Sequence, residues 1–203
     1  MQVTKCKALQ DERRMKMTLT VIAGGMFAEK TTELQRRGRR LKRAGKRVAY
    51  FKPAMDTRYS ENEIVSHDGA KVDAISIKEN TPIQIASREY FEEYDVFLID
   101  EVQFFTSYIM TTIETLLRGG KTVIVAGLDL DFKAHPFFTV SALMSIAENV
   151  VKLHAVCSEC GDDAWVSHKE EGGQRIQLGT DEYTPMCRKC FNNLKKKGTV
   201  NNG

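Results

Sequence analysis

The sequence of 203 residues lacks any apolar run close to the roughly eighteen residues that a membrane-spanning helix needs. Its first sixteen residues also lack the apolar stretch of a secretory signal. A membrane-spanning or secreted protein is therefore disfavoured, and we expect a soluble, cytoplasmic one. Residues 1–16 and 192–203 contain few large apolar side chains, so we expect a flexible leader and a flexible tail.

The sequence has little excess charge of either sign. Its formal net charge is +3, and residues 1–16 carry five basic and two acidic side chains, which accounts for all of it. Residues 17–203 are therefore balanced, whereas a protein that binds duplex DNA usually presents a broad basic face. We expect neither a nucleic-acid nor a membrane partner, although local basic clusters around an anionic ligand remain compatible with this balance.

Cysteine is scarce, and four of the five cysteines fall into two close pairs, Cys157-x2-Cys160 and Cys187-x2-Cys190, with 26 residues between them. In a protein without a secretory signal this number does not indicate a disulfide framework. Four thiolates spaced in this way are typical of a closed tetrahedral zinc site, which has no open position for a catalytic water. Two disulfides or buried free thiols are the alternatives. The pattern predicts a structural zinc ion in a small lobe over residues 157–191.

Apolar segments alternate with helical patterns between residues 17 and 156. Continuous apolar strands separated by helices predict an α/β domain with a parallel sheet covered on both faces. Ligands in such folds bind at the carboxyl ends of the strands. The expected strands are 18–23, 47–52, 95–100, 122–127 and 150–156, and the expected helices are 30–44, 107–118 and 141–148.

The segment after the first expected strand has the position and length of a Walker A phosphate-binding loop. It runs from Gly24 to Thr31 and departs from G-x-x-x-x-G-K-[ST] at one position, where Glu29 replaces the second glycine. Lys30 and Thr31 supply the lysine for the β- and γ-phosphates and the hydroxyl for magnesium. Two unit charges about 4 Å apart repel by roughly 4 kcal/mol at an effective dielectric of about 20. If this loop binds ATP, we therefore expect the Glu29 carboxylate to point away from the phosphates.

An acidic pair follows the third expected strand. Asp100 and Glu101 come directly after the apolar run VFLI, in the position of a Walker B acid. There, Asp100 is suited to orient magnesium and Glu101 to accept a proton. Two ordinary acids in a strand-end turn are the alternative.

Taken together, these motifs resemble the cellular, zinc-containing type of thymidine kinase over roughly residues 18–191. The stretches that carry the resemblance are GGMFAEKTTELQRR, FKPAMDTRYS with the following SHDG, IDEVQFF, VIVAGLDLDFKAHPF, KLHAVCSECG and GTDEYTPMCRKCF. The resemblance implies a RecA-like P-loop domain with a C-terminal zinc-ribbon lobe. That lobe carries a lasso that closes over the nucleoside. It also implies transfer of the γ-phosphate of ATP to the 5′-hydroxyl of thymidine, with Mg²⁺ and a homotetrameric or homodimeric assembly.

The resemblance also implies roles for individual residues. Glu101 would be the general base, and Asp56 and Arg58 would line the phosphoryl-transfer site. The residues expected to bind the cofactor are Gly24, Gly25, Met26, Phe27, Ala28, Glu29, Lys30, Thr31, Asp100 and Gln103. The residues expected to surround the nucleoside are Met26, Phe104, Leu128, Phe132, Phe137, Ile176, Gln177, Leu178 and Tyr183.

Three departures from the family pattern lead to further expectations. Family members usually carry Ser-Gly in place of Ala28-Glu29, Gly-Pro in place of Gly24-Gly25, and glycine in place of Phe138. Phe138 would narrow or reshape the nucleoside pocket, which leaves open the preference among thymidine, deoxyuridine and 5-substituted analogues. Because of Glu29, the alternative to an active thymidine kinase is a catalytically impaired homologue that binds a nucleoside or nucleotide. A zinc-ribbon ATPase acting on nucleic acid is disfavoured by the balanced charge and by the absence of a long basic or aromatic ribbon.

Overall fold

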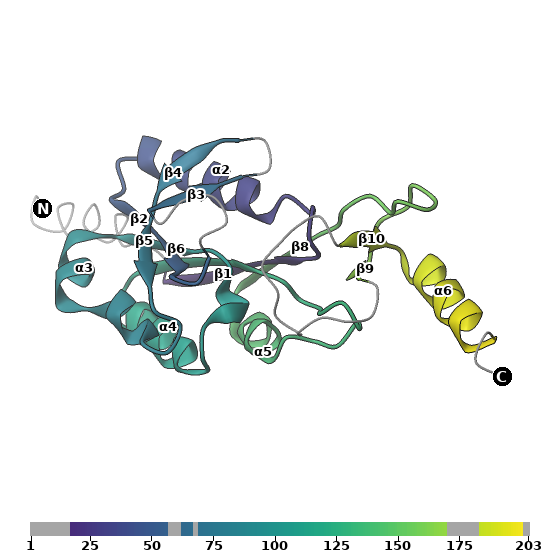
Figure 1. Ribbon diagram of the computed structural model, residues 1–203. Helices are drawn as coiled ribbons and strands as arrows, with labels where there is room; N and C mark the ends of the chain where they lie inside the picture. Colours follow the sequence, from purple (N-terminus) through teal and green to yellow (C-terminus); the bar gives the residue numbers. More distant parts are fainter. Residues whose placement is uncertain (1–16, 57–61, 67–68, 170–182, 201–203) are drawn as a thin grey trace, which may run out of the picture.

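The computed structural model describes residues 17–56, 62–66, 69–169 and 183–200, with side chains described as far as Leu194. A six-stranded parallel sheet has the order β5-β2-β6-β7-β1-β8 and forms the centre of the molecule (Figure 1). Its strands are β1 (Thr18–Gly24), β2 (Val48–Pro53), β5 (Ile75–Ile77), β6 (Val96–Ile99), β7 (Thr122–Gly127) and β8 (Asn149–Leu153).

Helices cover both faces of this sheet, as predicted. Helix α2 (Lys30–Arg43) lies over one face, while α4 (Tyr108–Arg118) and α5 (Phe138–Ile146) lie over the other (Figure 1). The strand side chains alternate between these layers, as the two-residue period of a strand requires. Leu19 and Val21 of β1 pack in the cluster with α4 and α5, whereas Ile22 packs in the cluster with α2.

Shorter elements complete the α/β part. They are the hairpin of β3 (Glu63–Val65) and β4 (Lys71–Asp73), the 3-10 helices η1 (Pro82–Ala86) and η2 (Val102–Phe104), and helix α3 (Arg88–Glu93). The hairpin packs over the α2 face through Ile64. Within the described ranges, no helix is long and apolar enough to cross a membrane.

The C-terminal lobe contains a small antiparallel pair of strands, β9 (Val166–His168) and β10 (Thr184–Met186), followed by helix α6 (Arg188–Val200). Its own apolar cluster consists of Val166, Met186 and Phe191 with a few partly buried neighbours. Because three buried side chains make a very small core, a metal ion is the expected source of stability for such a lobe.

The element boundaries differ from prediction at the end of the α/β part. Helix α5 begins at Phe138 and ends at Ile146, whereas we expected it over 141–148. Glu148 instead lies outside the helix and accepts a hydrogen bond from the Leu19 backbone N–H at 2.6 Å. Strand β8 ends at Leu153 rather than 156, because Val156 forms an isolated bridge with Asp163. Residues 192–200, expected in the flexible tail, continue helix α6.

Candidate active site

The phosphate loop leaves the carboxyl end of β1 and turns sharply into α2. Gly24 has φ +154°, and a Cβ at this position would lie 2.3 Å from the backbone oxygen of Leu153. At Gly25, a Cβ would lie 2.8 Å from Ser167 Oγ. Both glycines are therefore needed for close approach, in one case to β8 and in the other to the C-terminal lobe. The backbone of the loop has the tight geometry that the motif predicted.

The lysine and hydroxyl of the motif lie inside this turn. Lys30 Nζ donates a hydrogen bond to the Gly25 backbone oxygen at 2.6 Å, so the lysine side chain folds across the loop. Thr31 Oγ1 donates to Asp100 Oδ2 at 2.9 Å. This contact joins the loop after β1 to the acid after β6, although 69 residues separate the two in sequence. The structure thus brings together the two groups that the sequence predicted for magnesium.

The acidic pair occupies two different environments. Asp100 is buried, and this burial together with the neighbouring Glu101 carboxylate raises its pKa to about 7, despite the opposing hydrogen bond from Thr31. Glu101 is only half-buried and has the left-handed backbone angles φ 50° and ψ 42°. A left-handed conformation is unfavourable for a residue with a Cβ, and such strain is common at functional sites. The strained turn directs Asp100 and Glu101 to different surroundings.

Gln103 fixes the position of Glu101. Its Nε2 donates to Glu101 Oε2 at 2.5 Å, and its Oε1 accepts from the Leu128 backbone N–H at 3.1 Å. Gln103 is itself buried. Because both ends of its amide bond to protein groups, Gln103 orients Glu101, and its expected contact with the nucleotide stays a prediction. It also connects Glu101 to the loop that follows β7.

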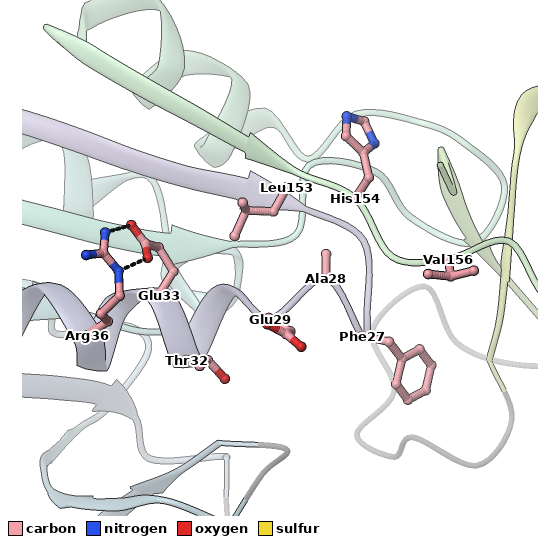
Figure 2. Close-up of a pocket in the computed structure, with 9 residues that line it drawn as sticks. All are labelled: Phe27, Ala28, Glu29, Thr32, Glu33, Arg36, Leu153, His154 and Val156. Atoms are coloured by element: carbon pink, nitrogen blue, oxygen red, sulfur yellow. Dashed lines mark hydrogen bonds and ion pairs between the residues drawn. The ribbon is translucent and has the colours of Figure 1, made fainter. Parts of the chain in front are cut away.

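Glu29 is the first residue outside the glycine pattern, and the structure shows how the loop accommodates it. Its backbone is left-handed, with φ 55° and ψ 28°, which is the conformation that favours glycine. Its side chain is exposed. No other described residue donates a hydrogen bond to its carboxylate or forms an ion pair with it. In Figure 2 the Glu29 and Thr32 side chains are directed to the same side of the chain.

Glu29 is one of the residues that line a cavity beside the phosphate loop (Figure 2). This cavity has a volume of about 360 Å³. One wall comes from the phosphate loop and the first two turns of α2, and the other from the end of β8 and the residues that follow it. The residues that line it are Phe27, Ala28, Glu29, Thr32, Glu33, Arg36, Leu153, His154 and Val156.

Five of the residues expected to surround a nucleoside lie at the carboxyl edge of the sheet. Met26 follows β1, Phe104 lies in η2 after β6, and Leu128 follows β7. Phe132 and Phe137 are buried in the loop before α5, where Phe137 also belongs to the main apolar cluster. Phe138 is 75% exposed, so it does not pack with these side chains. An effect of Phe138 on the nucleoside pocket stays a prediction.

Of the remaining predicted residues, Asp56 and Tyr183 lie within the described ranges. Asp56 follows β2, whose neighbour β6 leads to Asp100. Tyr183 is half-buried, with the Lys169 ammonium 5.8 Å from the centre of its ring. The predicted residues that lie outside the described ranges are Arg58, Ile176, Gln177 and Leu178.

The four cysteines of the two CxxC pairs come together in the C-terminal lobe. Their sulfur atoms all lie within 4.8 Å of one another. Burial raises the pKa of the Cys157 thiol, but backbone N–H groups of Cys187, Glu159 and Cys160 outweigh burial and lower it to about 6. Backbone donors that favour a thiolate, in a cluster of four sulfurs, fit tetrahedral zinc. These cysteines are thiols rather than disulfides in the structure.

Comparison with known proteins identifies the family. The model of the thymidine kinase family matches residues 17–191. The chain belongs to the thymidine kinase family. A thymidine kinase of Bacteroides thetaiotaomicron is 43% identical over 189 residues, which cover 92% of this chain and 92% of that protein. A thymidine kinase of Bacteroides fragilis is 43% identical over 182 residues, 89% of each chain. Among solved structures, the flagellar accessory protein FlaH of Methanocaldococcus jannaschii aligns with a TM-score of 0.49 and 15% identity, over 70% of this chain and 76% of that chain.

Sequence analysis did not predict two residues, Ser167 and Lys52, whose hydrogen bonds support the site of this thymidine kinase family member. Ser167 of β9 accepts a hydrogen bond from the Met26 backbone N–H at 2.7 Å, which ties the C-terminal lobe to the phosphate loop. Lys52 is buried and donates to the backbone oxygens of Asp56 at 2.8 Å and Glu63 at 3.1 Å. No local pattern marks Ser167, because 141 residues separate it from Met26. Lys52 carried a signal, since a lysine within an apolar strand is rare unless its charge is satisfied.

Proposed function

We propose that this protein transfers the γ-phosphate of ATP to the 5′-hydroxyl of thymidine. The observation that carries the proposal is the convergence of Lys30, Thr31, Asp100 and Glu101 at the carboxyl edge of the sheet, in a chain of the thymidine kinase family. Phosphoryl transfer depends mainly on positioning and on stabilising negative charge, and these four groups supply both. The names of the Bacteroides relatives support thymidine as the acceptor.

In this proposal the phosphate loop binds the phosphates of ATP, and the acidic pair serves magnesium binding and proton transfer. The Lys30 ammonium leaves the Gly25 oxygen and contacts the phosphates, while backbone N–H groups of the loop and the start of α2 surround them. Thr31 and Asp100 would hold Mg²⁺, which would offset the negative charge of the transferring phosphate. The hydrogen bond between Thr31 and Asp100 keeps the two ligands adjacent before magnesium arrives.

Glu101 accepts the proton of the 5′-hydroxyl. The amide of Gln103 donates to one carboxylate oxygen at 2.5 Å and so fixes the orientation of this carboxylate. A general base must lie within hydrogen-bond reach of the proton that it takes, and the fixed position of Glu101 serves this requirement. We assign Asp56 and Arg58 to the same transfer site, as the family resemblance implies.

The aromatic and aliphatic side chains at the same edge are proposed to form the nucleoside pocket. A flat base needs apolar walls and a few polar contacts. The side chains assigned to these walls are Met26, Phe104, Leu128, Phe132, Phe137 and Tyr183. The backbone of Ile176, Gln177 and Leu178 is assigned to the edge of the base. We assign the four cysteines to a structural zinc ion, the α/β domain to residues 17–156 and the lasso lobe to residues 157–191.

A coupled assay of ADP release tests this function. With ATP, Mg²⁺ and thymidine, we expect turnover that depends on all three components. Glu101→Gln should lower kcat by roughly 100-fold or more, because a general base contributes about 10²–10⁴-fold. Glu114→Gln, an exposed change on α4, is the matched control and should keep full activity. Thymidine-independent ATP hydrolysis, or equal activity of Glu101→Gln and wild type, would count against the proposal.

The catalytically impaired homologue has no structural support beyond the sequence change that suggested it. The exposed Glu29 side chain lies on the wall of a cavity beside the loop, and the glycine-like backbone of the loop is retained. We therefore propose an active enzyme. A cytoplasmic location and a homodimeric or homotetrameric assembly stay predictions from the family resemblance.

A further inference from the structure

The cavity beside the phosphate loop continues from the phosphate site along the first turns of α2. Thr32, which lines it, directly follows the hydroxyl residue of the motif. The opposite wall comes from the end of β8, the strand next to β1 in the sheet, and from the residues that follow it. A nucleotide with its phosphates at the start of α2 and its sugar and base in this cavity contacts these residues. The inference below rests on the proposed function, since it concerns the nucleotide that donates the phosphate.

The polar groups on the cavity wall are mostly engaged with other protein groups. Arg36 forms two hydrogen bonds with Glu33, at 2.6 and 2.8 Å, and Arg37 adds a third at 2.7 Å. His154 Nδ1 lies 3.0 Å from the Ala164 backbone oxygen. Among the described residues, Glu29 and Thr32 have no such partner. The carboxylate of Glu29 is therefore a free hydrogen-bond acceptor on a wall that is otherwise satisfied.

The chemistry of Glu29 decides which part of a nucleotide it contacts. A carboxylate without a proton only accepts hydrogen bonds, so it repels phosphate oxygens and favours hydroxyl groups. The other free surface of the cavity is apolar, from Phe27, Leu153 and Val156, and suits the face of a base. Between phosphate and base, the donors that a ribonucleotide offers are the two hydroxyls of its ribose. In dinucleotide-binding folds an acidic side chain makes this same contact with the 2′-hydroxyl.

We propose that Glu29 binds the ribose hydroxyls of the phosphate donor and gives this enzyme a preference for ribonucleotides over deoxyribonucleotides. The side chain that interrupts the glycine pattern thus becomes a specificity-determining residue. Glu29 has a left-handed backbone and lines the cavity, while the Lys30 side chain folds across the loop to the Gly25 backbone oxygen. The loop keeps its phosphate-binding geometry and gains a contact that glycine would not provide.

Equilibrium binding of ATP, 2′-deoxyATP and 3′-deoxyATP in the presence of Mg²⁺ tests the proposal. We expect wild type to bind ATP roughly tenfold more tightly than at least one deoxy analogue, as for the loss of one hydrogen bond to a charged group. In Glu29→Gly the ratio should fall toward one, and Glu29→Gln should lie between the two. Glycine suits the left-handed backbone, so this variant is expected to fold. Glu114→Gln removes a distant negative charge and should keep the wild-type ratio.

The outcomes separate the role of Glu29 from the function of the protein. Thymidine turnover is measured with ATP and with 2′-deoxyATP in the same variants. If wild type phosphorylates thymidine but the ratio of the two donors is the same in wild type and Glu29→Gly, the role of Glu29 is wrong and the proposed function stands. If wild type binds none of the three nucleotides, both are overturned.

Discussion

Ser167 of the C-terminal lobe accepts a hydrogen bond from the backbone N–H of Met26 in the phosphate loop, at a distance of 2.7 Å. Ser167 is buried, and its hydroxyl oxygen lies only 2.8 Å from the position that a Cβ on Gly25 would take. The lobe that the cysteines hold together is therefore in direct contact with the loop that binds phosphate. Changes in one are expected to reach the other without passing through the sheet.

The first prediction concerns this contact. Ser167→Ala leaves the Met26 N–H without its partner, and an unsatisfied N–H costs about 1–3 kcal/mol. We expect a lower free energy of unfolding in urea and a higher KM for ATP. Ser167→Thr keeps the hydroxyl and should restore much of both. Ser145→Ala, an exposed change on α5, is the control; a Ser167→Ala protein that behaves like this control would show that the contact is unimportant.

Removal of zinc should affect substrate binding before it affects the α/β part. Structural zinc sites in small peptides supply roughly 10–16 kcal/mol, and the lobe here has only a small apolar cluster of its own. A chelator should therefore release the lobe, with Tyr183 and Ser167, while the parallel sheet stays folded. Thymidine affinity, measured by calorimetry, should fall while the far-UV circular dichroism changes little. Unchanged affinity in zinc-free protein would contradict the assignment of the lobe to substrate binding.

The acidic pair predicts an unusual dependence of stability on pH. Burial and the neighbouring carboxylate raise the pKa of Asp100 from 3.8 to about 7 in the folded protein. Between about pH 4 and pH 7 the folded state keeps a proton that the unfolded chain has lost. Since stability falls with pH wherever the folded state binds more protons, metal-free protein should lose stability as pH rises through this window. Asp100→Asn should remove this loss.

Asp95→Asn provides the contrast for this measurement. Hydrogen bonds from Arg47 lower the pKa of Asp95, so its contribution is present above its unfolded pKa and is lost as pH falls. Urea unfolding between about pH 2 and pH 8 separates the two, because the Asp95 contribution changes only below about pH 4, whereas that of Asp100 changes above it. An Asp100→Asn protein with the same pH slope as wild type would mean that Asp100 is ionised throughout. Magnesium binding should strengthen across the same window in wild type, since it needs the carboxylate.

The first glycine of the phosphate loop should tolerate substitution poorly. In Gly24→Ala the new methyl group would lie 2.3 Å from the backbone oxygen of Leu153, which cannot rotate away. We expect a loss of about 2–4 kcal/mol in the free energy of unfolding and loss of ATP binding, since β1 and β8 must separate. Gly45→Ala is the matched control: φ is +77°, but nothing lies within 4 Å of the new group. Its cost should be only about 1 kcal/mol, and equal costs would contradict the steric argument.

Local sequence patterns predicted the framework well. The apolar runs before Gly24 and Asp100 became β1 and β6, and the helix expected over 30–44 became α2. These features depend on residues close together in the chain, where periodicity and glycine give a direct signal. The grouping of the four cysteines was also predicted, because metal-ligand spacing is specific.

The sequence did not reveal the contacts that hold the site together. The hydrogen bonds of Ser167 with Met26 and of Gln103 with Leu128 join distant segments, and a polar residue alone does not indicate its partner. The direction of the Glu29 side chain depends on a left-handed backbone that only the closed loop imposes. Helix α5 begins at Phe138, three residues earlier than expected, and the Phe138 ring is exposed at its start.

The position of β1 in the sheet also affects how the chain folds. Strand β1 is made first, yet it pairs with β7 and β8, which begin at residues 122 and 149. On the ribosome, the segment that carries the phosphate loop must therefore wait for most of the chain before its neighbours exist. Such distant pairing slows folding and leaves apolar strands exposed to aggregation. Protein fragments that end before β7 should accordingly need chaperones.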